Sequence, residues 1–314
     1  MKFEKLENIP DISASAEVKV SLMGNIVEMK YLSNKNTKAT IIPISKDEYV
    51  LASTGEVLQF EHHDSRKDNK KGLFKTFARL RALINTNVEN VENVRWITLT
   101  YAENMTDTRR LYKDFQKFNQ RFQYYCEISN YGKAEYIVAA EPQQRGAWHM
   151  HLLYIWQEKA PFIPNSKLAE IWGHGFVKIT KIDNVDNLGA YLTAYLTDIP
   201  FEDWKGGDVR GVIPKLVKTA NNESKMVLKG QRLALYPTNM NIYRCSRGII
   251  PPQVGYMDYM DFLDYSEGFT CNYERAVKLT DDKNDYSTVI VTKQYKQKVA
   301  QGNQRKSFPG GNNI

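Results

Sequence analysis

The sequence lacks the features of secreted, membrane-spanning and disulfide-stapled proteins. Its three cysteines, Cys126, Cys245 and Cys271, are an odd number, lie far apart and form no Cys-x-x-Cys pair, so neither a disulfide framework nor a zinc or redox site is expected. No apolar run approaches the ~18 residues that cross a bilayer, and the first twenty residues have no apolar core of a signal peptide. We therefore expect a cytoplasmic protein without a membrane-spanning segment.

The composition is that of an ordinary globular chain with a surplus of positive charge. Its 314 residues are 42% hydrophobic and 25% charged, which does not fit a disordered or collagen-like chain. A net charge of +7 and a sequence pI of about 9.0 favour polyanionic partners. Charge alone does not separate a DNA-binding protein from the many basic proteins that bind no nucleic acid.

The pattern of residues divides the chain into four ranges. Residues 1–64 alternate apolar and polar positions in short runs, which predicts a β-rich N-terminal region. Residues 65–200 hold the core and begin with a basic helix, whose apolar positions Leu73, Phe77, Leu80 and Ile84 recur at helical spacing. Residues 201–292 form a basic C-terminal region, and residues 293–314 a flexible basic tail.

Strands and helices are mixed within the range 65–200. Apolar runs predict strands at 95–102, 134–141, 149–156 and 175–182, and helical spacing predicts helices at 108–123, 166–172 and 187–197. The second and third strands are joined by PQQRGAW, whose Pro142 and Gly146 supply turn chemistry for a hairpin. The sequence therefore predicts an α+β fold.

Three residues of this hairpin suit a metal site. His149 and His151 alternate along one strand, so both imidazoles point to the same face. Antiparallel pairing across the turn can bring Glu141 beside them. Two imidazoles and a carboxylate suit Mn²⁺, or Mg²⁺ where phosphate oxygens complete the shell. A non-haem iron site uses the same ligand types, and two incidental surface histidines are the simpler alternative.

Two tyrosines follow on the last predicted helix. Tyr191 and Tyr195 are four residues apart, so they lie one above the other on the same helix face. A phenol with a pKa of ~10 is a poor nucleophile unless a base, a positive charge or a metal-polarised phosphate assists it. Core aromatics at helical spacing are the alternative, which we would favour without the neighbouring Glu141, His149 and His151.

Three segments in order resemble the HUH endonucleases, in particular the replication initiators of rolling-circle plasmids and single-stranded DNA phages: ITLTYAEN at 97–104, EPQQRGAWHMHLL at 141–153 and YLTAYLTD at 191–198. The resemblance implies an antiparallel β-sheet core with flanking helices. It makes His149 and His151 metal ligands, Glu141 the third ligand, and Tyr191 or Tyr195 the nucleophile. Ala194 and Asp198 stand where many relatives carry lysines, and Lys178 or Lys181 could take over that role.

The same resemblance implies that the protein nicks one DNA strand at an origin, leaving a 5′-phosphotyrosine and a free 3′-OH. The DNA would be single-stranded or a hairpin, and the expected DNA contacts are Lys75, Arg79, Arg81, Arg145, Lys178, Lys181, Arg244 and Arg247. No GxxxxGK[ST] loop is present, so host helicase and polymerase are inferred partners. A relaxase or transposase with the same chemistry, a non-catalytic origin-binding regulator and a zinc hydrolase are the alternatives.

Overall fold

The computed structural model describes residues 2–35, 41–52, 55–60, 70–182, 187–200, 214–218, 224–228, 231–237, 240–281 and 285–297. These residues belong to two compact units, which we describe separately. Unit 1 is formed by residues 1–62 and 252–314, and unit 2 by residues 63–251. Unit 2 is thus an insertion within the chain of unit 1.

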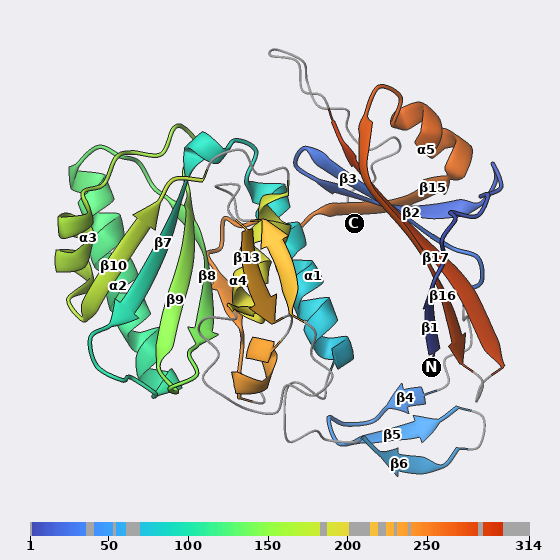
Figure 1. Cartoon of the computed structure of the whole chain (residues 1–314), viewed down its shortest axis with the longest axis horizontal. Coiled ribbons are helices and arrows are strands. Elements are labelled where there is room, and N and C mark those ends of the chain that lie inside the picture. Colours follow the sequence, from blue (N-terminus) through green and yellow to red (C-terminus); the bar gives the residue numbers. More distant parts are fainter. Residues whose placement is uncertain are drawn as a thin grey trace. The chain divides into compact units, whose positions relative to one another are not determined.

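A five-stranded antiparallel sheet forms the centre of unit 2 (Figure 1). Its strands in spatial order are β10 (Gly175–Thr180), β7 (Val94–Tyr101), β9 (Trp148–Ile155), β8 (Glu135–Pro142) and β14 (Tyr243–Cys245). The predicted hairpin is confirmed, since β8 pairs with β9 and places Glu141 opposite His149. β14 pairs with β8 although it lies beyond the range 65–200 that the sequence marks as the core.

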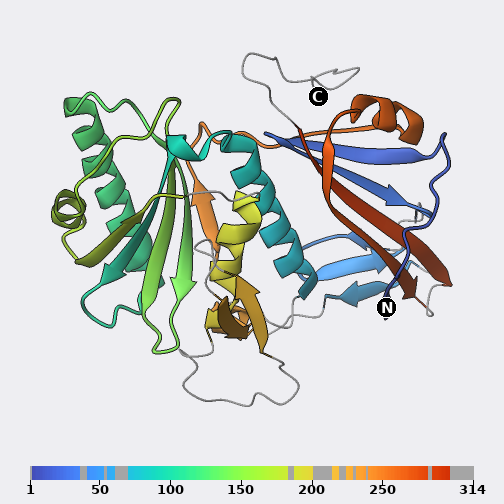
Figure 2. The same ribbon diagram turned by 45° about the horizontal axis from the view of Figure 1, so that its top comes forward.

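Helices cover both faces of this sheet (Figure 2). Helix α2 (Thr108–Ile128) and helix α3 (Asn165–Trp172) lie on one face, while α1 (Lys70–Asn87) and α4 (Leu188–Thr197) lie on the other. The side chain of Asp107 caps α2 by accepting hydrogen bonds from the amides of Arg109 and Arg110. The four apolar positions expected on one face of α2 are all buried: Leu111, Phe115, Phe118 and Phe122. Each contributes roughly 1.5–3 kcal/mol by leaving water.

Smaller elements complete unit 2. A three-stranded sheet has the order β11 (Ile199–Pro200), β13 (Ser224–Leu228) and β12 (Lys215–Lys218). A 3-10 turn, η3 (Gln231–Leu235), follows it in the chain, and another, η1 (Val91–Asn93), precedes β7. β11 continues directly from the end of α4, so the small sheet begins where the tyrosine-bearing helix stops.

Unit 1 is built on a six-stranded antiparallel sheet. In spatial order its strands are β1 (Lys2–Lys5), β16 (Thr270–Asp281), β17 (Tyr286–Lys296), β3 (Ile26–Leu32), β2 (Glu17–Met23) and β15 (Gln253–Asp258). The short helix α5 (Tyr259–Tyr265) packs Phe262 against Val18, Val20 and Met29 on one face of the sheet. A second sheet has the order β4 (Ile41–Pro43), β5 (Glu48–Leu51) and β6 (Val57–Gln59).

The predicted α+β fold with antiparallel sheets and flanking helices is confirmed. The four sequence ranges do not follow the two units, because residues 201–292 contribute strands to both. Of the expected basic tail, residues 293–296 belong to β17, and residues 298–314 lie outside the described part of the chain. Among the described residues, no helix is long and apolar enough to cross a membrane.

Candidate active site

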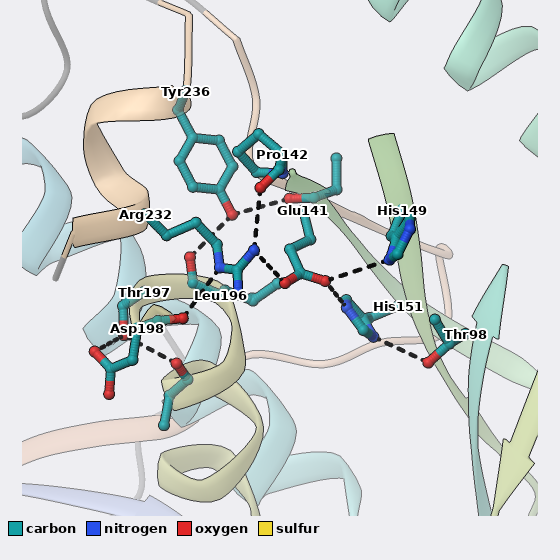
Figure 3. Close-up of polar contacts among 12 residues, drawn as sticks. Thr98, Glu141, Pro142, His149, His151, Leu196, Thr197, Asp198, Arg232 and Tyr236 are labelled. Carbon is teal, nitrogen blue, oxygen red and sulfur yellow. Dashed lines mark hydrogen bonds and ion pairs between the residues drawn. The ribbon is translucent and has the colours of Figure 1, made fainter. Parts of the chain in front are cut away.

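The β8–β9 hairpin brings the three expected metal ligands together on the sheet face that carries α1 and α4 (Figure 3). Glu141 Oε2 is in direct contact with His151 Nε2 and lies 4.0 Å from His149 Nδ1. Glu141 and His151 are buried, whereas the His149 side chain keeps 22% of its surface exposed. The sequence prediction that strand alternation and hairpin pairing would gather these side chains is therefore matched by their positions.

Strand β7 fixes the orientation of His151. Thr98 is the cross-strand neighbour of His151, and its Oγ1 lies 3.2 Å from His151 Nδ1. The indole of Trp96 stacks on the His151 ring with a centroid distance of 5.2 Å and an interplanar angle of 12°. A proton on Nδ1 directed to the threonine hydroxyl leaves Nε2 as the donor atom on the Glu141 side.

Arg232 is the fourth charged group of the site, and sequence reasoning assigned it no role beyond membership of the basic C-terminal region. Its NH1 lies 2.5 Å from Glu141 Oε1, so Arg232 and the two histidines contact different oxygens of one carboxylate. Burial alone would raise the pKa of the Glu141 carboxyl, but His151, Arg232 and His149 together lower it. Glu141 is therefore a carboxylate at neutral pH.

His149 is neutral at the same pH. Burial lowers the pKa of its imidazole more strongly than Glu141 raises it, and the nearby charges of Arg145 and Arg232 lower it further. Its Nε2 is buried and has no hydrogen-bond partner among the described residues. A buried, neutral imidazole with an unsatisfied ring nitrogen is a group for which a ligand atom would remove a desolvation cost.

The donor types fit a divalent cation such as Mn²⁺, because one carboxylate and two imidazoles converge and one imidazole nitrogen is unsatisfied by the described residues. As the side chains stand, however, the described residues contain no group of three His, Cys, Asp or Glu arranged to hold a metal. The direct contact between Glu141 and His151 accounts for this, since it occupies the space between two of the donors. Metal binding therefore requires that contact to open.

Helix α4 carries Tyr191 and Tyr195 one turn apart, and the side chains of both lie outside the described part of the structure. The start of α4 is fixed to α1 through Asn85. Asn85 Oδ1 accepts a hydrogen bond from Gly189 N at 2.9 Å, and its amide donates to the N-cap residue Asn187 at 3.0 Å. A Cβ on Gly189 would lie 2.5 Å from the Arg81 carbonyl oxygen, so glycine permits this close approach of the helices.

The end of α4 is fixed to β8 by two side chains from the η3 region. Arg232 Nε donates to the carbonyl of Asp198, the C-cap residue, at 3.1 Å, and NH1 donates to the carbonyl of Pro142 at 3.1 Å. The Tyr236 hydroxyl lies 3.0 Å from the Ala140 carbonyl and 3.1 Å from the Leu196 carbonyl. We call Arg232 and Tyr236 the clamp. Their distance from Glu141 in sequence exceeds any local spacing rule, so only three-dimensional structure identifies them.

The Asp198 carboxylate accepts a hydrogen bond from the Thr197 hydroxyl at 3.0 Å. It stands where many HUH relatives carry lysine, so the negative charge there is tied to the helix end rather than aimed at Glu141. Lys178, proposed as a substitute for such a lysine, is exposed on β10 and is the cross-strand neighbour of Thr98. Lys178 therefore lies on the same sheet face as His151, two strands away.

The other expected DNA contacts are spread over unit 2. Lys75 and Arg79 are exposed and Arg81 is half-buried on α1, and Arg145 is exposed in the hairpin turn. Lys181 lies 3.9 Å from a Glu92 carboxylate oxygen. The Arg244 guanidinium lies 3.6 Å from the centre of the Tyr112 ring. Arg247 lines a hollow of about 1220 Å³ that none of the three candidate metal ligands borders.

An exposed aromatic residue on the same face escaped the sequence interpretation. Phe176 on the edge strand β10 is 71% exposed. It is the cross-strand neighbour of Thr100, which in turn faces His149. The signal was present in the sequence, since an apolar residue at a position that alternates with Val177 and Ile179 must point away from their core.

The comparisons with known proteins bear on this part of the chain. Neither a curated protein nor a solved structure matches the sequence. One family model, described as a replication-associated protein of the ORF2 type, matches residues 94–199. The matched segment runs from the start of β7 to the start of β11 and so contains Glu141, His149, His151 and the tyrosine-bearing helix. Over this segment, the chain is similar to replication-associated proteins.

Proposed function

We propose that the protein is a rolling-circle replication initiator that nicks one DNA strand at an origin. Glu141, His149 and His151 would hold a divalent cation, Mn²⁺ or Mg²⁺, and Tyr191 or Tyr195 would be the nucleophile. The observation that carries the proposal is the convergence of two imidazoles and one carboxylate on the sheet face against which the tyrosine-bearing helix packs. The match of residues 94–199 to a replication-associated family supports the same role.

The chemical step is a transesterification. The phenol oxygen attacks the scissile phosphorus, a P–O bond to tyrosine forms, and the P–O3′ bond breaks. The phenol proton passes to solvent, and the departing 3′ oxygen takes up a proton to become a hydroxyl. A bound divalent cation supplies charge stabilisation on the phosphate oxygens. One ester replaces another, so the step needs no nucleotide cofactor and can run backward to rejoin the strand.

The chain's own residues would prepare this step. Thr98 and Trp96 hold the His151 ring in one orientation, and Arg232 leaves Glu141 Oε2 facing the histidines. The contacts of Asn85 and of the clamp fix the two ends of α4. Such fixed geometry is what enzymes use to replace a bimolecular encounter, and a misplacement of about 1 Å can cost about 100-fold in rate.

Single-stranded DNA would approach over the part of this face formed by β10, β7 and β9. Phe176 offers an exposed ring for base stacking and Lys178 a charge for the backbone, in neighbouring rows of the sheet that lead to His149 and His151. Arg145 in the hairpin turn adds a charge beside the candidate ligands. Unwinding of the duplex would fall to a host helicase, and extension of the 3′-OH to a host polymerase.

Nicking by the purified full chain tests the proposal. Labelled single-stranded oligonucleotides that tile its own replicon are incubated with Mn²⁺ or with EDTA and separated on denaturing gels. We expect a Mn²⁺-dependent cut with protein attached to the new 5′ end. Tyr191→Phe and Tyr195→Phe then assign the nucleophile, with Tyr124→Phe as control because Tyr124 is exposed on α2, on the opposite face of the sheet.

Two outcomes would overturn the assignment. A covalent adduct that persists in the Tyr191→Phe/Tyr195→Phe double variant would exclude both tyrosines. Origin binding without any cut, with or without Mn²⁺, would favour a non-catalytic regulator instead. Cleavage at a transfer origin or a transposon end rather than a replication origin would assign the same chemistry to a relaxase or a transposase.

A further inference from the structure

Arg232 connects the candidate metal site with the helix that carries the tyrosines. Its guanidinium makes contacts in two directions: to Glu141 Oε1 and the Pro142 carbonyl at the end of β8, and to the Asp198 carbonyl at the end of α4. Arg232 and Glu141 are each only 9% exposed at the side chain. A buried charge pair of this kind is costly to break from one side, because the remaining charge stays uncompensated.

Tyr236 makes a parallel connection with a neutral group. Its hydroxyl lies between the carbonyls of Ala140 on β8 and Leu196 on α4, and its single proton can be donated to only one of them at a time. Both of these partners are backbone carbonyls, whereas Arg232 also binds the Glu141 carboxylate. The two members of the clamp therefore hold the same pair of elements, and Arg232 in addition holds the candidate metal ligand.

The bonds to α4 also satisfy the helix end. The last carbonyls of a helix have no partner within it, and a cation near that end is favourable because of the helix dipole. Arg232 supplies both a donor and a positive charge to the Asp198 carbonyl. One side chain thus sets the orientation of Glu141 and the position of the last turn of α4, which follows Tyr195.

We propose that Arg232 is a positioning residue that couples the two halves of the site: it holds Glu141 with one oxygen toward His149 and His151, and it holds the end of α4 at a fixed place relative to that carboxylate. This inference rests on the proposed nicking function for its consequence in catalysis. Its structural part, the coupling of Glu141 to α4, can be tested without any nicking activity.

Three full-length variants separate the two roles. Arg232→Lys keeps a positive charge but cannot make the set of guanidinium bonds to Glu141, Pro142 and Asp198. Tyr236→Phe removes the neutral connection and leaves the contact between Arg232 and Glu141. Phe122→Leu is the matched control, because Phe122 is fully buried on α2 on the other face of the sheet, and its replacement lowers stability without touching the clamp.

Amide hydrogen exchange and Mn²⁺ affinity come first. We expect faster exchange at residues 188–198 in both clamp variants and unchanged exchange there in Phe122→Leu. Mn²⁺ titration should show a Kd raised about 10-fold or more in Arg232→Lys, as for the removal of a side chain that orients a metal ligand, and raised less than about threefold in Tyr236→Phe. Unchanged exchange in α4 together with unchanged Mn²⁺ affinity in Arg232→Lys would overturn the coupling.

Adduct formation at saturating Mn²⁺ then tests the catalytic consequence. We expect Arg232→Lys to be slower than the unchanged protein by about 10- to 100-fold, Tyr236→Phe to be slower by a smaller factor, and Phe122→Leu to keep its rate below its melting temperature. A rate in Arg232→Lys equal to that of the unchanged protein would refute the positioning role. If the unchanged protein forms no adduct, the proposed function fails, and exchange and Mn²⁺ affinity still decide the coupling.

Discussion

The two units of the chain carry similar numbers of acidic residues but very different numbers of basic ones. Unit 2 holds 28 of the 43 Lys and Arg and 19 of the 36 Asp and Glu, a net charge of +9, whereas unit 1 has a net charge of −2. The modest charge of +7 for the whole chain therefore hides a strongly basic unit. Averaging over two units weakens a nucleic-acid signal that is clear in one of them.

The units also differ in how their sheets are covered. The central sheet of unit 2 has helices on both faces, yet leaves β10 and part of β7 open beside the candidate site. In unit 1 the described helix α5 packs on one face of the six-stranded sheet. A sheet between helices can hold polar groups such as Glu141 and Arg232 out of water, which is what a site with buried charges requires.

The sharpest difference expected between the units is in chemistry. His151→Ala removes a candidate metal donor, and we expect adduct formation to fall by more than about 100-fold. The control is His174→Ala, also in unit 2, whose ring packs against Trp172 and which lies outside the candidate site. Gel quantification of the adduct checks both. Equal losses in the two variants would show that the effect is general instability and not metal binding.

Stability should also respond in unit 2 alone. Gly189→Ala places a Cβ 2.5 Å from the Arg81 carbonyl oxygen, and overpacking of this kind costs about 1–3 kcal/mol. Urea unfolding followed by tryptophan fluorescence measures the change, since all five Trp residues lie in unit 2. Gly268→Ala in unit 1, where φ is +80° but no atom of the described residues lies within 4 Å of the added Cβ, is the comparison. It should leave the fluorescence transition of unit 2 unchanged.

A matched pair of exposed aromatics tests where single-stranded DNA binds. Phe176 is 71% exposed on an edge strand of unit 2, and Tyr256 is 59% exposed on an edge strand of unit 1. Removal of one base-stacking interaction costs about 1–3 kcal/mol, so Phe176→Ala should raise the Kd for an oligonucleotide at least about fivefold. Fluorescence anisotropy measures it. An equal or larger effect of Tyr256→Ala would break the assignment of DNA binding to unit 2.

The smallest expected effect concerns charge. The double variant Arg145→Glu/Lys178→Glu should weaken DNA binding and lower the slope of log K against log salt by about 1 for each phosphate that is no longer neutralised. Arg275→Glu/Lys278→Glu makes the same charge change at two exposed positions of unit 1. Anisotropy titrations over a range of salt concentrations compare them. Identical slopes for the two double variants would mean that only total charge matters.

Local pattern predicted much of unit 2. Helix α2, the β8–β9 hairpin and helix α4 were all predicted from periodicity and turn residues within a few positions of their observed bounds. Glu141, His149 and His151 were gathered by the same logic, because strand alternation and hairpin pairing act over a few residues. Whether they bind metal stays a prediction.

Longer connections were beyond reach of the sequence. Arg232 and Tyr236 contact β8 from about 90 residues away, and no spacing rule relates a side chain of η3 to a strand so distant. A weak sign existed, since Arg232 stands in the otherwise apolar run Gln231–Leu235. The pairing of β15 and β17 with β2 and β3 is likewise non-local.

The insertion of unit 2 within unit 1 has a consequence for the order of events during synthesis. Strands β2 and β3 leave the ribosome early, but their partners β15 and β17 follow only after the whole of unit 2. Unit 2 can therefore complete its sheet while the N-terminal strands still have open edges. Such edges attract other strands, so nascent chains stalled between residues 252 and 286 should be the ones that depend most on chaperones.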